Sequence, residues 1–218
     1  MDNNLKILYE DKHITVCVKP KGIASEDSAT EKGIIGLLSQ RAGKSLHLLH
    51  RLDRNVGGVM VFANNKQSAA ILSKAIAEGK LQKEYLAVLD GIPDEKSAVL
   101  KDLLFKDSRK NRSYVVNRVR KGVKEASLEY QIKGEAQGKA LVQVLLHTGR
   151  THQIRVQFSS RRLCLTGDIK YGSKDRTNCE IALHSYKITF THPVTNEIMT
   201  FTYEPDFSSY PWHLFKGD

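Results

Sequence analysis

The chain has 218 residues, enough for one large domain or two closely joined lobes with a substantial core. Hydrophobic residues make up 40% of it and charged residues 27%, so the composition indicates a globular protein and excludes a disordered one. The 34 lysines and arginines exceed the 24 aspartates and glutamates by 10. This surplus favours a polyanionic partner such as RNA or DNA, although many basic proteins carry it only to stay soluble.

The three cysteines, Cys17, Cys164 and Cys179, are widely spaced and form no Cys-x-x-Cys pair. Disulfides and a cysteine zinc site are therefore not expected. The N-terminus has no apolar stretch typical of a signal peptide, and no apolar run is long enough to cross a bilayer. We therefore expect a reduced, cytoplasmic protein that does not enter a membrane.

Residues 5–41 predict a β-hairpin followed by a short helix. Residues 5–9 and 14–18 are apolar or β-branched, and a polar turn separates them. The segment Lys19-Pro20-Lys21-Gly22 ends the second strand and leaves basic side chains on a loop. Residues 33–41 then carry an apolar stripe that is typical of a helix.

In residues 47–58, one carboxylate lies between two arginines. Asp53 is flanked by Arg51 and Arg54, and two glycines precede the apolar run 59–63. This pattern predicts a loop that enters a buried strand, a usual place for chemistry. The arginines would keep the aspartate ionised and could hold phosphates, so Asp53 is a candidate nucleophile or base acting on a nucleic acid. A surface ion-pair cluster of the same three residues explains this stretch equally well.

A helix and a strand follow, and their order indicates an α/β arrangement. Asn64 and Asn65 can cap a helix over residues 66–78, which Gly79 would end. Residues 83–91 predict the next strand. The side chains expected on the buried side of the helix are those of Ala69, Ala70, Leu72, Ile76 and Ala77.

Residues 97–122 are strongly basic, with eight lysines and arginines against two aspartates. Tyr114 lies among them, and this combination is typical of a surface that contacts phosphates and stacks on bases. Arg109, Lys110 and Arg112 are candidate phosphate contacts only. The alternative is a solvated face on an inserted hairpin.

Residues 127–132 and 140–146 predict an antiparallel strand pair, and a dense polar stretch follows it. There, Thr151 can cap a helix that carries Ile154, and a helix start preceded by Gly149 and Arg150 is a natural anion site. Arg155, one turn further in, is a candidate partner for a semi-buried carboxylate.

The last third of the chain predicts a turn-rich loop and a hairpin. Glycines at 167 and 172 mark the loop over residues 166–172. Residues 181–190 and 198–203 read as strands around a polar turn.

Several common catalytic arrangements find no support. His47 and His50 are three apart, but no histidine has a carboxylate at the spacing of His-Glu-x-x-His, so no metal site is expected. There is no Gly-x-Gly-x-x-Gly after a strand, no complete Gly-x-x-x-x-Gly-Lys-Ser/Thr loop and no Gly-x-Ser-x-Gly turn. A paired-carboxylate glycosidase would need a second acid, and none stands out. What remains is an aspartate among arginines, a tyrosine on a neighbouring strand and an arginine on a later helix.

Five segments together are specific, although each alone is weak. They are Lys19-Pro20-Lys21-Gly22, His50-Arg51-Leu52-Asp53, a Lys-x-Tyr-x-Ala-x-x-x-Gly pattern over residues 83–91, Gly149-Arg150-Thr151-His152-Gln153-Ile154-Arg155, and Leu183-His184 with His192-Pro193 and Glu197. In this order they resemble the pseudouridine synthases of the RluA class, and the resemblance covers nearly the whole chain.

The resemblance implies an enzyme that isomerises uridine to pseudouridine in ribosomal or transfer RNA without a cofactor or metal. Asp53 would attack the uridine, at C1′ or the base, or remove a ribose proton. The C–N bond then breaks, the uracil turns, and a C–C bond forms at C5. The nucleoside must leave its helix to reach Asp53.

The same resemblance implies roles for residues around Asp53. Tyr85 would stack on the flipped base with its hydroxyl near C5, although an ordinary half-buried strand tyrosine is the simpler explanation without the family. Arg155 would pair with Asp53, lowering its pKa and aiming it. Arg51 would enter the gap that the flipped nucleoside leaves, or hold its phosphate. The alternative role for Arg51 is a structural ion pair with Asp53.

Four further residues are implied at the substrate. Ile154 would pack against the base, and Arg150 would hold RNA or brace its loop. Lys19 and Lys21 are candidate phosphate contacts.

The implied fold is α/β (α+β), with a bent, mixed, mostly antiparallel sheet, flanking helices and a central basic cleft. It would form a single catalytic domain over residues 1–218, with two sub-lobes. We expect a monomer by default. We also expect no amino-terminal S4-type RNA-binding module, because the Lys-Pro loop comes by residue 20. RNA contact would then rely on the catalytic domain, a partner or both.

The chain departs from the family at two further places. Val56-Gly57-Gly58 replaces the usual Thr-Ser-Gly, and Gln157 replaces the usual histidine after Gln-Ile-Arg-Val. The main alternative is a catalytically silent RNA-binding protein with the same fold. An unrelated nucleic-acid hydrolase would need a metal or a second acid.

Overall fold

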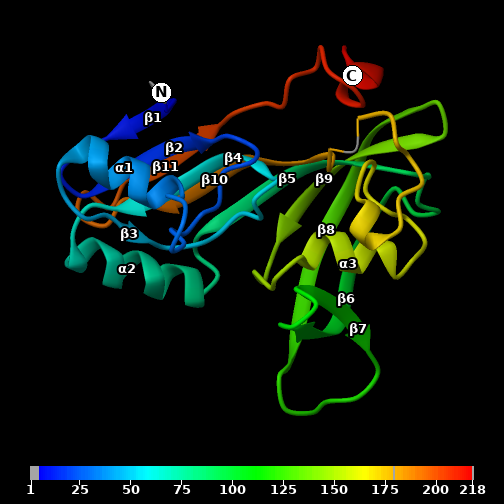
Figure 1. Ribbon diagram of the computed structural model, residues 1–218, viewed down its shortest axis with the longest axis horizontal. Helices are drawn as coiled ribbons and strands as arrows, with labels where there is room; N and C mark the ends of the chain where they lie inside the picture. The colour runs from blue at the N-terminus through cyan, green and yellow to red at the C-terminus, as the bar shows by residue number, and fades with distance from the viewer. Residues whose placement is uncertain (1–4, 179, 218) are drawn as a thin grey trace. The chain divides into compact units, whose positions relative to one another are not determined.

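The computed structural model describes residues 5–178 and 180–217, which fall into two compact units (Figure 1). Unit 1 takes its described residues from 1–83 and 184–204, and unit 2 from 84–183 and 205–218. Cys179 lies outside the described residues, so the expectation about it is not addressed.

The strands of unit 1 run in the order β1-β2-β4-β10, with β11 beside β10 and β3 beside β4. The β4 and β10 strands are parallel, whereas the other neighbours are antiparallel. The two predicted hairpins at the ends of the chain, β1–β2 and β10–β11, are therefore confirmed. The bounds are β1 (Ile7–Glu10), β2 (Ile14–Lys19), β3 (His47–Leu48), β4 (Gly57–Ala63), β10 (Leu183–Thr191) and β11 (Ile198–Thr202).

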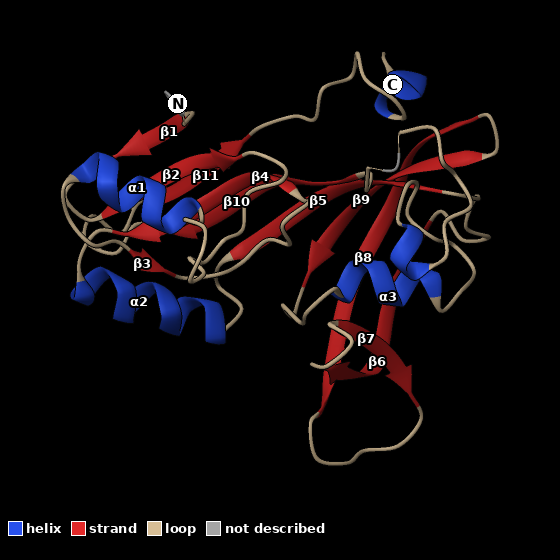
Figure 2. Cartoon of the chain, viewed as in Figure 1, coloured by secondary structure: helices blue, strands red, loops and turns tan. Residues whose placement is uncertain are grey.

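The β4 strand forms the centre of unit 1, and all seven of its residues are buried. Side chains alternate between the two faces of a strand, and Val59 and Val61 lie in one core cluster with Leu72 of α2 (Lys66–Ala77). In Figure 2 the α2 helix runs beside β3 and β4. The core therefore fixes the strand that follows the Asp53 loop.

The α2 helix begins as predicted, because the Asn65 side chain accepts a hydrogen bond from the Ser68 backbone N–H. The predicted buried side is partly wrong, since Ala70 and Ala77 are exposed. Ser68 is buried instead, because it lies four residues before Leu72 on the same helix face.

The other helix of unit 1 is α1 (Ile34–Ala42), which agrees with the predicted residues 33–41. Its buried side chains, Ile34 and Leu38, are four residues apart. Gly43 ends it with a φ of 64°, a left-handed conformation that glycine adopts without strain.

Unit 2 has the strand order β5-β9-β8-β6-β7, and the β9–β8, β8–β6 and β6–β7 pairs are antiparallel. The predicted pair over 127–132 and 140–146 is confirmed, and it extends further at both strands. The basic residues 97–122 form the β6–β7 hairpin and the loop after it. The bounds are β5 (Gln82–Leu89), β6 (Ser97–Asp107), β7 (Arg112–Val116), β8 (Val123–Ala136) and β9 (Lys139–Leu146).

The α3 helix (Gln153–Ser159) packs against β6 and β7, with Val156 in a core cluster beside Leu104 and Ala126. Thr151 does not cap it, so that prediction is wrong. The residue before the helix is His152, which has a φ of 55°, and no side chain caps the first turn. Two 3-10 turns complete the unit, η1 (Ile169–Tyr171) and η2 (Trp212–Phe215).

The mixed, mostly antiparallel strands with helices confirm the predicted α/β class. The predicted single domain, the bend of the sheet and the central basic cleft stay predictions. Within the described ranges, every helix is too short or too polar to cross a membrane.

Candidate active site

The loop that carries Asp53 is held at three consecutive residues by its backbone. The Ser25 hydroxyl accepts a hydrogen bond from the Leu52 N–H at 2.9 Å and donates to the Leu52 carbonyl at 2.8 Å. The Asp53 carbonyl accepts from the Val56 N–H at 3.0 Å, and the Arg54 carbonyl accepts from the Gly22 N–H at 2.9 Å. The loop therefore presents the half-buried Asp53 side chain from a fixed main chain.

Lys19 lies inside this framework and not on its surface. Its side chain is fully buried, and its ammonium donates to the carbonyls of Pro20, Ile23 and Arg54 at 2.9, 2.7 and 3.1 Å. An ammonium has three donors, so these bonds use all of them. Burial lowers the pKa of Lys19 to about 8, and the nearby Asp53 carboxylate opposes that shift. This geometry corrects the predicted phosphate contact: Lys19 braces the Asp53 loop.

The two arginines beside Asp53 pair with glutamates. Arg51 Nη1 lies 2.8 Å from Glu26 Oε2, and both side chains are more than half exposed. Arg54 forms two bonds to the Glu31 carboxylate, at 2.8 and 3.1 Å. The predicted alternative, in which both arginines form an ion-pair cluster with Asp53, is therefore wrong. Lys21, the other basic residue of the preceding loop, is exposed.

Close packing explains the glycine at position 58, whereas position 57 is less tightly enclosed. A Cβ atom at Gly58 would lie 2.1 Å from the Ser185 carbonyl oxygen, and the φ of Gly58 is +119°. A Cβ atom at Gly57 would lie 3.2 Å from the Lys19 carbonyl oxygen. The third residue of the family's Thr-Ser-Gly pattern is therefore kept as Gly58, where a side chain cannot fit. The departures are at positions 56 and 57.

His50 joins the start of the loop to β4. Its Nε2 accepts a hydrogen bond from the Val61 N–H at 3.3 Å, so the neutral ring carries its proton on Nδ1. Burial, with a contribution from Lys83, lowers the pKa of His50 to about 3. His50 is therefore a neutral structural residue at physiological pH.

Arg155, on α3, is held in unit 2 by Asp168. Arg155 Nε donates to Asp168 Oδ2 at 2.7 Å and Nη2 donates to Oδ1 at 2.9 Å, and both side chains are almost completely buried. The guanidinium also lies over the Tyr171 ring, 4.9 Å from its centre. A bidentate pair of this kind fixes the plane of the guanidinium.

The same tyrosine ties the start of α3 to β7. The Tyr171 hydroxyl accepts from the Ser113 N–H at 2.8 Å and lies 2.9 Å from His152 Nδ1. Gln153 is also buried, and its Oε1 accepts from the Arg150 N–H while its Nε2 donates to the Ser127 carbonyl. These bonds replace the predicted Thr151 cap in organising the first turn of the helix.

Three other predicted positions have clear surroundings. Arg150 Nε donates to the Glu125 carbonyl at 2.9 Å, which agrees with its bracing alternative. Gln157 is fully buried, and its Nε2 donates to the Leu100 carbonyl and to Asp102. Gln157 therefore takes a structural place where the family usually has histidine. Ile154 is buried on α3, and its contact with a base stays a prediction.

Tyr85 lies on β5 and is 5% exposed, more buried than the half-buried strand tyrosine considered above. Asp53 belongs to unit 1, whereas Tyr85 and Arg155 belong to unit 2. The pairing of Arg155 with Asp53 and the stacking of Tyr85 on a base therefore stay predictions.

In the part of the chain that the structure describes, no three histidine, cysteine, aspartate or glutamate side chains are grouped so as to hold a metal. The expectation that the reaction needs no metal or cofactor stays a prediction.

The sequence did not identify Ser25, Glu26, Glu31 or Asp168. Asp168 follows a glycine in a stretch that predicts only a turn-rich loop. The signal for it was indirect, because a buried arginine on a helix requires a carboxylate from elsewhere.

The fold agrees with the comparison to known families. Residues 13–160 match the family described as RNA pseudouridylate synthase. The chain belongs to this family.

Among curated proteins, the chain is 33% identical over 199 residues to "Ribosomal large subunit pseudouridine synthase C" of Buchnera aphidicola subsp. Acyrthosiphon pisum, covering 86% of this chain and 63% of that protein. It is 33% identical over 205 residues to "Uncharacterized RNA pseudouridine synthase YhcT" of Bacillus subtilis, covering 89% and 67%. The Escherichia coli K12 protein named "Ribosomal large subunit pseudouridine synthase C" is also 33% identical, over 210 residues, covering 88% and 64%. The chain thus spans about two thirds of the length of these relatives.

Two solved human structures share the fold. "Human RNA Pseudouridylate Synthase Domain Containing 4" matches with a TM-score of 0.76 at 23% identity, covering 93% of this chain and 89% of that one. "Human RNA Pseudouridylate Synthase Domain Containing 1" matches with a TM-score of 0.77 at 22% identity, covering 94% and 84%.

Proposed function

We propose that the protein isomerises uridine to pseudouridine in RNA, with Asp53 as the nucleophile or base. The observation that carries this proposal is the Asp53 loop, whose main chain is anchored at residues 52, 53 and 54 in a member of this family. A fixed main chain holds a reacting carboxylate in place before the substrate arrives.

The proposed reaction is an internal rearrangement. The Asp53 carboxylate attacks the flipped uridine or removes a ribose proton, the C–N bond breaks, and the uracil turns and re-forms its bond to the sugar through C5. As the new C–C bond forms, the bond to Asp53 breaks or the ribose proton returns; C5 then loses its proton and N1 gains one, so the product has the same atoms as the substrate. Neither an oxidant nor a group donor takes part, and we propose no cofactor or metal.

The other predicted site residues take supporting roles in this proposal. Tyr85 stacks on the base and accepts the C5 proton, and Ile154 contacts the base. Arg155 pairs with the Asp53 carboxylate and orients it for the reaction. Asp168 takes two of the five N–H donors of Arg155, so this pair is compatible with a second carboxylate at another edge of the guanidinium.

RNA is the proposed partner. Support comes from the net charge of +10 and from the β6–β7 hairpin and its following loop, which expose seven cationic side chains. Arg112 is the exception there, because it is half-buried with its guanidinium 5.0 Å from the Tyr171 ring centre. The seven exposed residues are Lys101, Lys106, Arg109, Lys110, Arg118, Arg120 and Lys121.

We propose ribosomal RNA of the large subunit as the first substrate to test, since relatives carry that name, with transfer RNA as the alternative. We propose that three side chains contact the phosphate backbone of the RNA. Arg51 and Lys21 do so near Asp53, and Arg150 does so beside α3. We also propose that the protein acts as a monomer in the cytoplasm.

The experiment is pseudouridine mapping of total RNA from cells with and without the gene, combined with the purified protein acting on RNA from the deletion strain. Asp53→Asn should lower activity by a factor on the order of 10³ or more without changing the melting temperature. Asp206→Asn makes the same chemical change at an exposed turn and should keep full activity. Full activity of Asp53→Asn would overturn the assigned role. RNA binding without any pseudouridine would instead support the catalytically silent alternative.

A further inference from the structure

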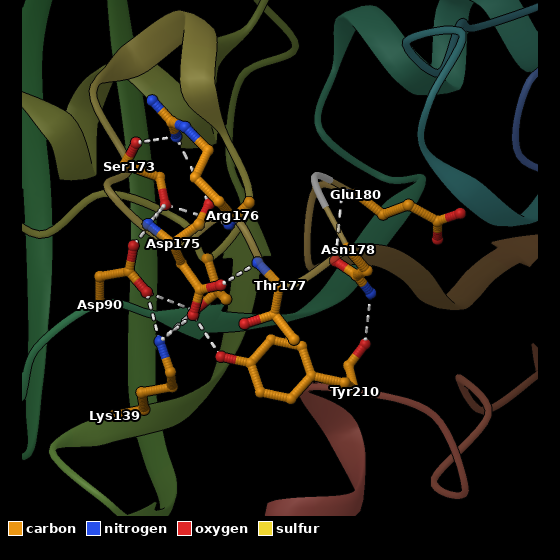
Figure 3. A network of polar contacts seen from close by, with 11 residues as sticks. Asp90, Lys139, Ser173, Asp175, Arg176, Thr177, Asn178, Glu180 and Tyr210 are labelled. Carbon is orange, nitrogen blue, oxygen red and sulfur yellow. Dashed lines mark hydrogen bonds and ion pairs between the residues drawn. The ribbon is translucent and has the colours of Figure 1, made fainter.

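A polar network in unit 2 surrounds the Asp90 carboxylate, which follows β5 (Figure 3). Lys139 Nζ lies 2.6 Å from Asp90 Oδ1 and 2.9 Å from Asp175 Oδ2. The Tyr210 hydroxyl also donates to Asp175. Lys139, Asp175 and Tyr210 lie outside the motifs that the sequence singled out, and Asp90 occupies an unspecified position of the 83–91 pattern.

Asp90 connects the two ends of one loop. Its Oδ1 accepts from the Thr166 hydroxyl at 2.7 Å, and its Oδ2 accepts from the Ser173 hydroxyl at 2.5 Å. The Ser173 oxygen in turn accepts from the Gly167 N–H at 3.1 Å. A single carboxylate therefore fixes the distance between residues 166 and 173.

The loop between these ends carries Asp168. The Asp168 N–H donates to the Leu165 carbonyl at 3.0 Å, and its carbonyl accepts from Tyr171 and Ser173 at 3.0 and 3.1 Å. Asp168 is 1% exposed, and its carboxylate binds Arg155 at two points. A shift of the loop ends would move this carboxylate, because the main chain on both sides of Asp168 is bonded to those ends.

The cation of the network is Lys139, which lies between the Asp90 and Asp175 carboxylates. Burial alone would lower the pKa of Lys139, but its hydrogen bonds to Asp90 and Asp175 outweigh burial and raise the pKa. Lys139 is therefore protonated at neutral pH and balances the carboxylate that holds the loop.

We propose that Asp90 is a positioning residue that acts through the 166–173 loop and Asp168 to fix the guanidinium of Arg155. The inference rests on the proposed function, because that function makes Arg155 the partner of the reacting carboxylate. A misplacement of about 1 Å at such a group costs roughly 10²-fold in rate. Asp90 itself touches no substrate in this scheme.

Four variants test the proposal in single-turnover assays. Asp90→Asn and the isosteric Thr166→Val should each lower the rate of pseudouridine formation by about 10- to 100-fold while RNA affinity stays within about twofold. Thr166→Ser restores the hydroxyl and should recover most of the rate. Asp206→Asn is the matched control and should keep the wild-type rate. Melting temperatures identify any variant that does not fold.

A double-mutant cycle separates positioning from a general structural role. If Asp90 acts only through the Asp168–Arg155 pair, Asp90→Asn should cause no further loss in an Asp168→Asn background. The same loss in both backgrounds would overturn the proposal.

A second measurement does not need activity. The Arg155 Nε–H signal, identified by its absence in Arg155→Lys, should exchange with solvent about 10-fold faster in Asp90→Asn and Thr166→Val, because its acceptor is displaced. Wild-type exchange in both variants would overturn the proposal. If the wild-type protein forms no pseudouridine but the exchange still accelerates, the proposed function fails while the link from Asp90 to Arg155 stands.

Discussion

Gly58 packs directly against the backbone of Ser185, with 2.1 Å between the Ser185 carbonyl oxygen and the place where a Cβ atom at position 58 would be. The two residues are opposite each other in the parallel pair of β4 and β10. The Ser185 hydroxyl also donates to the Val59 carbonyl at 3.0 Å. The Asp53 loop thus enters β4 where the neighbouring backbone leaves no space for a side chain.

Gly58→Ala should therefore destabilise the protein by at least about 2 kcal/mol, since it adds both a backbone clash and strain at a positive φ. Urea unfolding measures this change. Gly57→Ala is the control. A Cβ atom there would lie 3.2 Å from its nearest neighbour, the Lys19 carbonyl oxygen, so the loss of stability should be smaller. Equal effects at the two positions would contradict the close contact with Ser185.

Asp168→Asn should also be strongly destabilising, because it removes the charge from a buried, bidentate ion pair with the Arg155 guanidinium. The expected cost is about 3 kcal/mol or more in urea unfolding. Arg161→Gln breaks the more exposed pair with Asp102 in the same unit and should cost about 1 kcal/mol or less. A similar cost for both would mean that burial does not decide the strength of the Arg155 pair.

Stability should fall as the pH decreases from about 6.5 towards 4, partly because of His184. Its Nε2 lies 3.0 Å from the Tyr203 carbonyl oxygen, and burial lowers its pKa to about 4 from 6.5. Between these two values the unfolded state binds the extra proton, so acid favours unfolding by at most about 1.4 kcal/mol per pH unit. His50 acts in the same direction.

His184→Gln keeps a donor for Tyr203 but cannot take up the proton. Its melting temperature should therefore fall less than that of the wild type between about pH 7 and pH 5. An equal fall in melting temperature in the variant and the wild type would show that His184 does not contribute to the acid sensitivity.

Lys19 and Lys21 should respond differently to substitution, although they lie in the same basic loop. Lys21→Gln removes an exposed charge and should reduce the slope of log K against log salt for RNA binding by about 1. Lys19→Met should leave that slope unchanged but lower stability and activity, because three carbonyls lose their donor. A reduced slope in Lys19→Met would contradict its bracing role.

Much of the fold could be predicted because local patterns and packing agree. The run Val59–Ala63 is apolar throughout and is buried on both faces, and Asn65 caps α2 as its position predicts. The start of α3 could not be predicted, because Thr151 looks like a cap while the observed bonds come from Gln153. One of the Gln153 bonds is to the Ser127 carbonyl of β8, which is distant in sequence.

The candidate site was less accessible to prediction. Asp53 was identified from its neighbours, but the partners of those neighbours were not, since ion pairs such as Arg51–Glu26 join residues 25 positions apart. Lys19 reads as a surface charge because its sequence position cannot show that three carbonyls converge on its ammonium. Asp168 and Asp90 act across the fold, and neither has a local pattern that reveals its partner.

The glutamates that engage Arg51 and Arg54 also affect how RNA would bind at this loop. A phosphate that binds Arg51 competes with Glu26 for the same guanidinium, at a pair that is open to solvent. An arginine already neutralised by the protein draws phosphate from a distance less strongly, because its field is cancelled nearby. The loop would thus contribute little to the first encounter with RNA, and its arginines would engage only after the nucleic acid has been captured elsewhere on the protein.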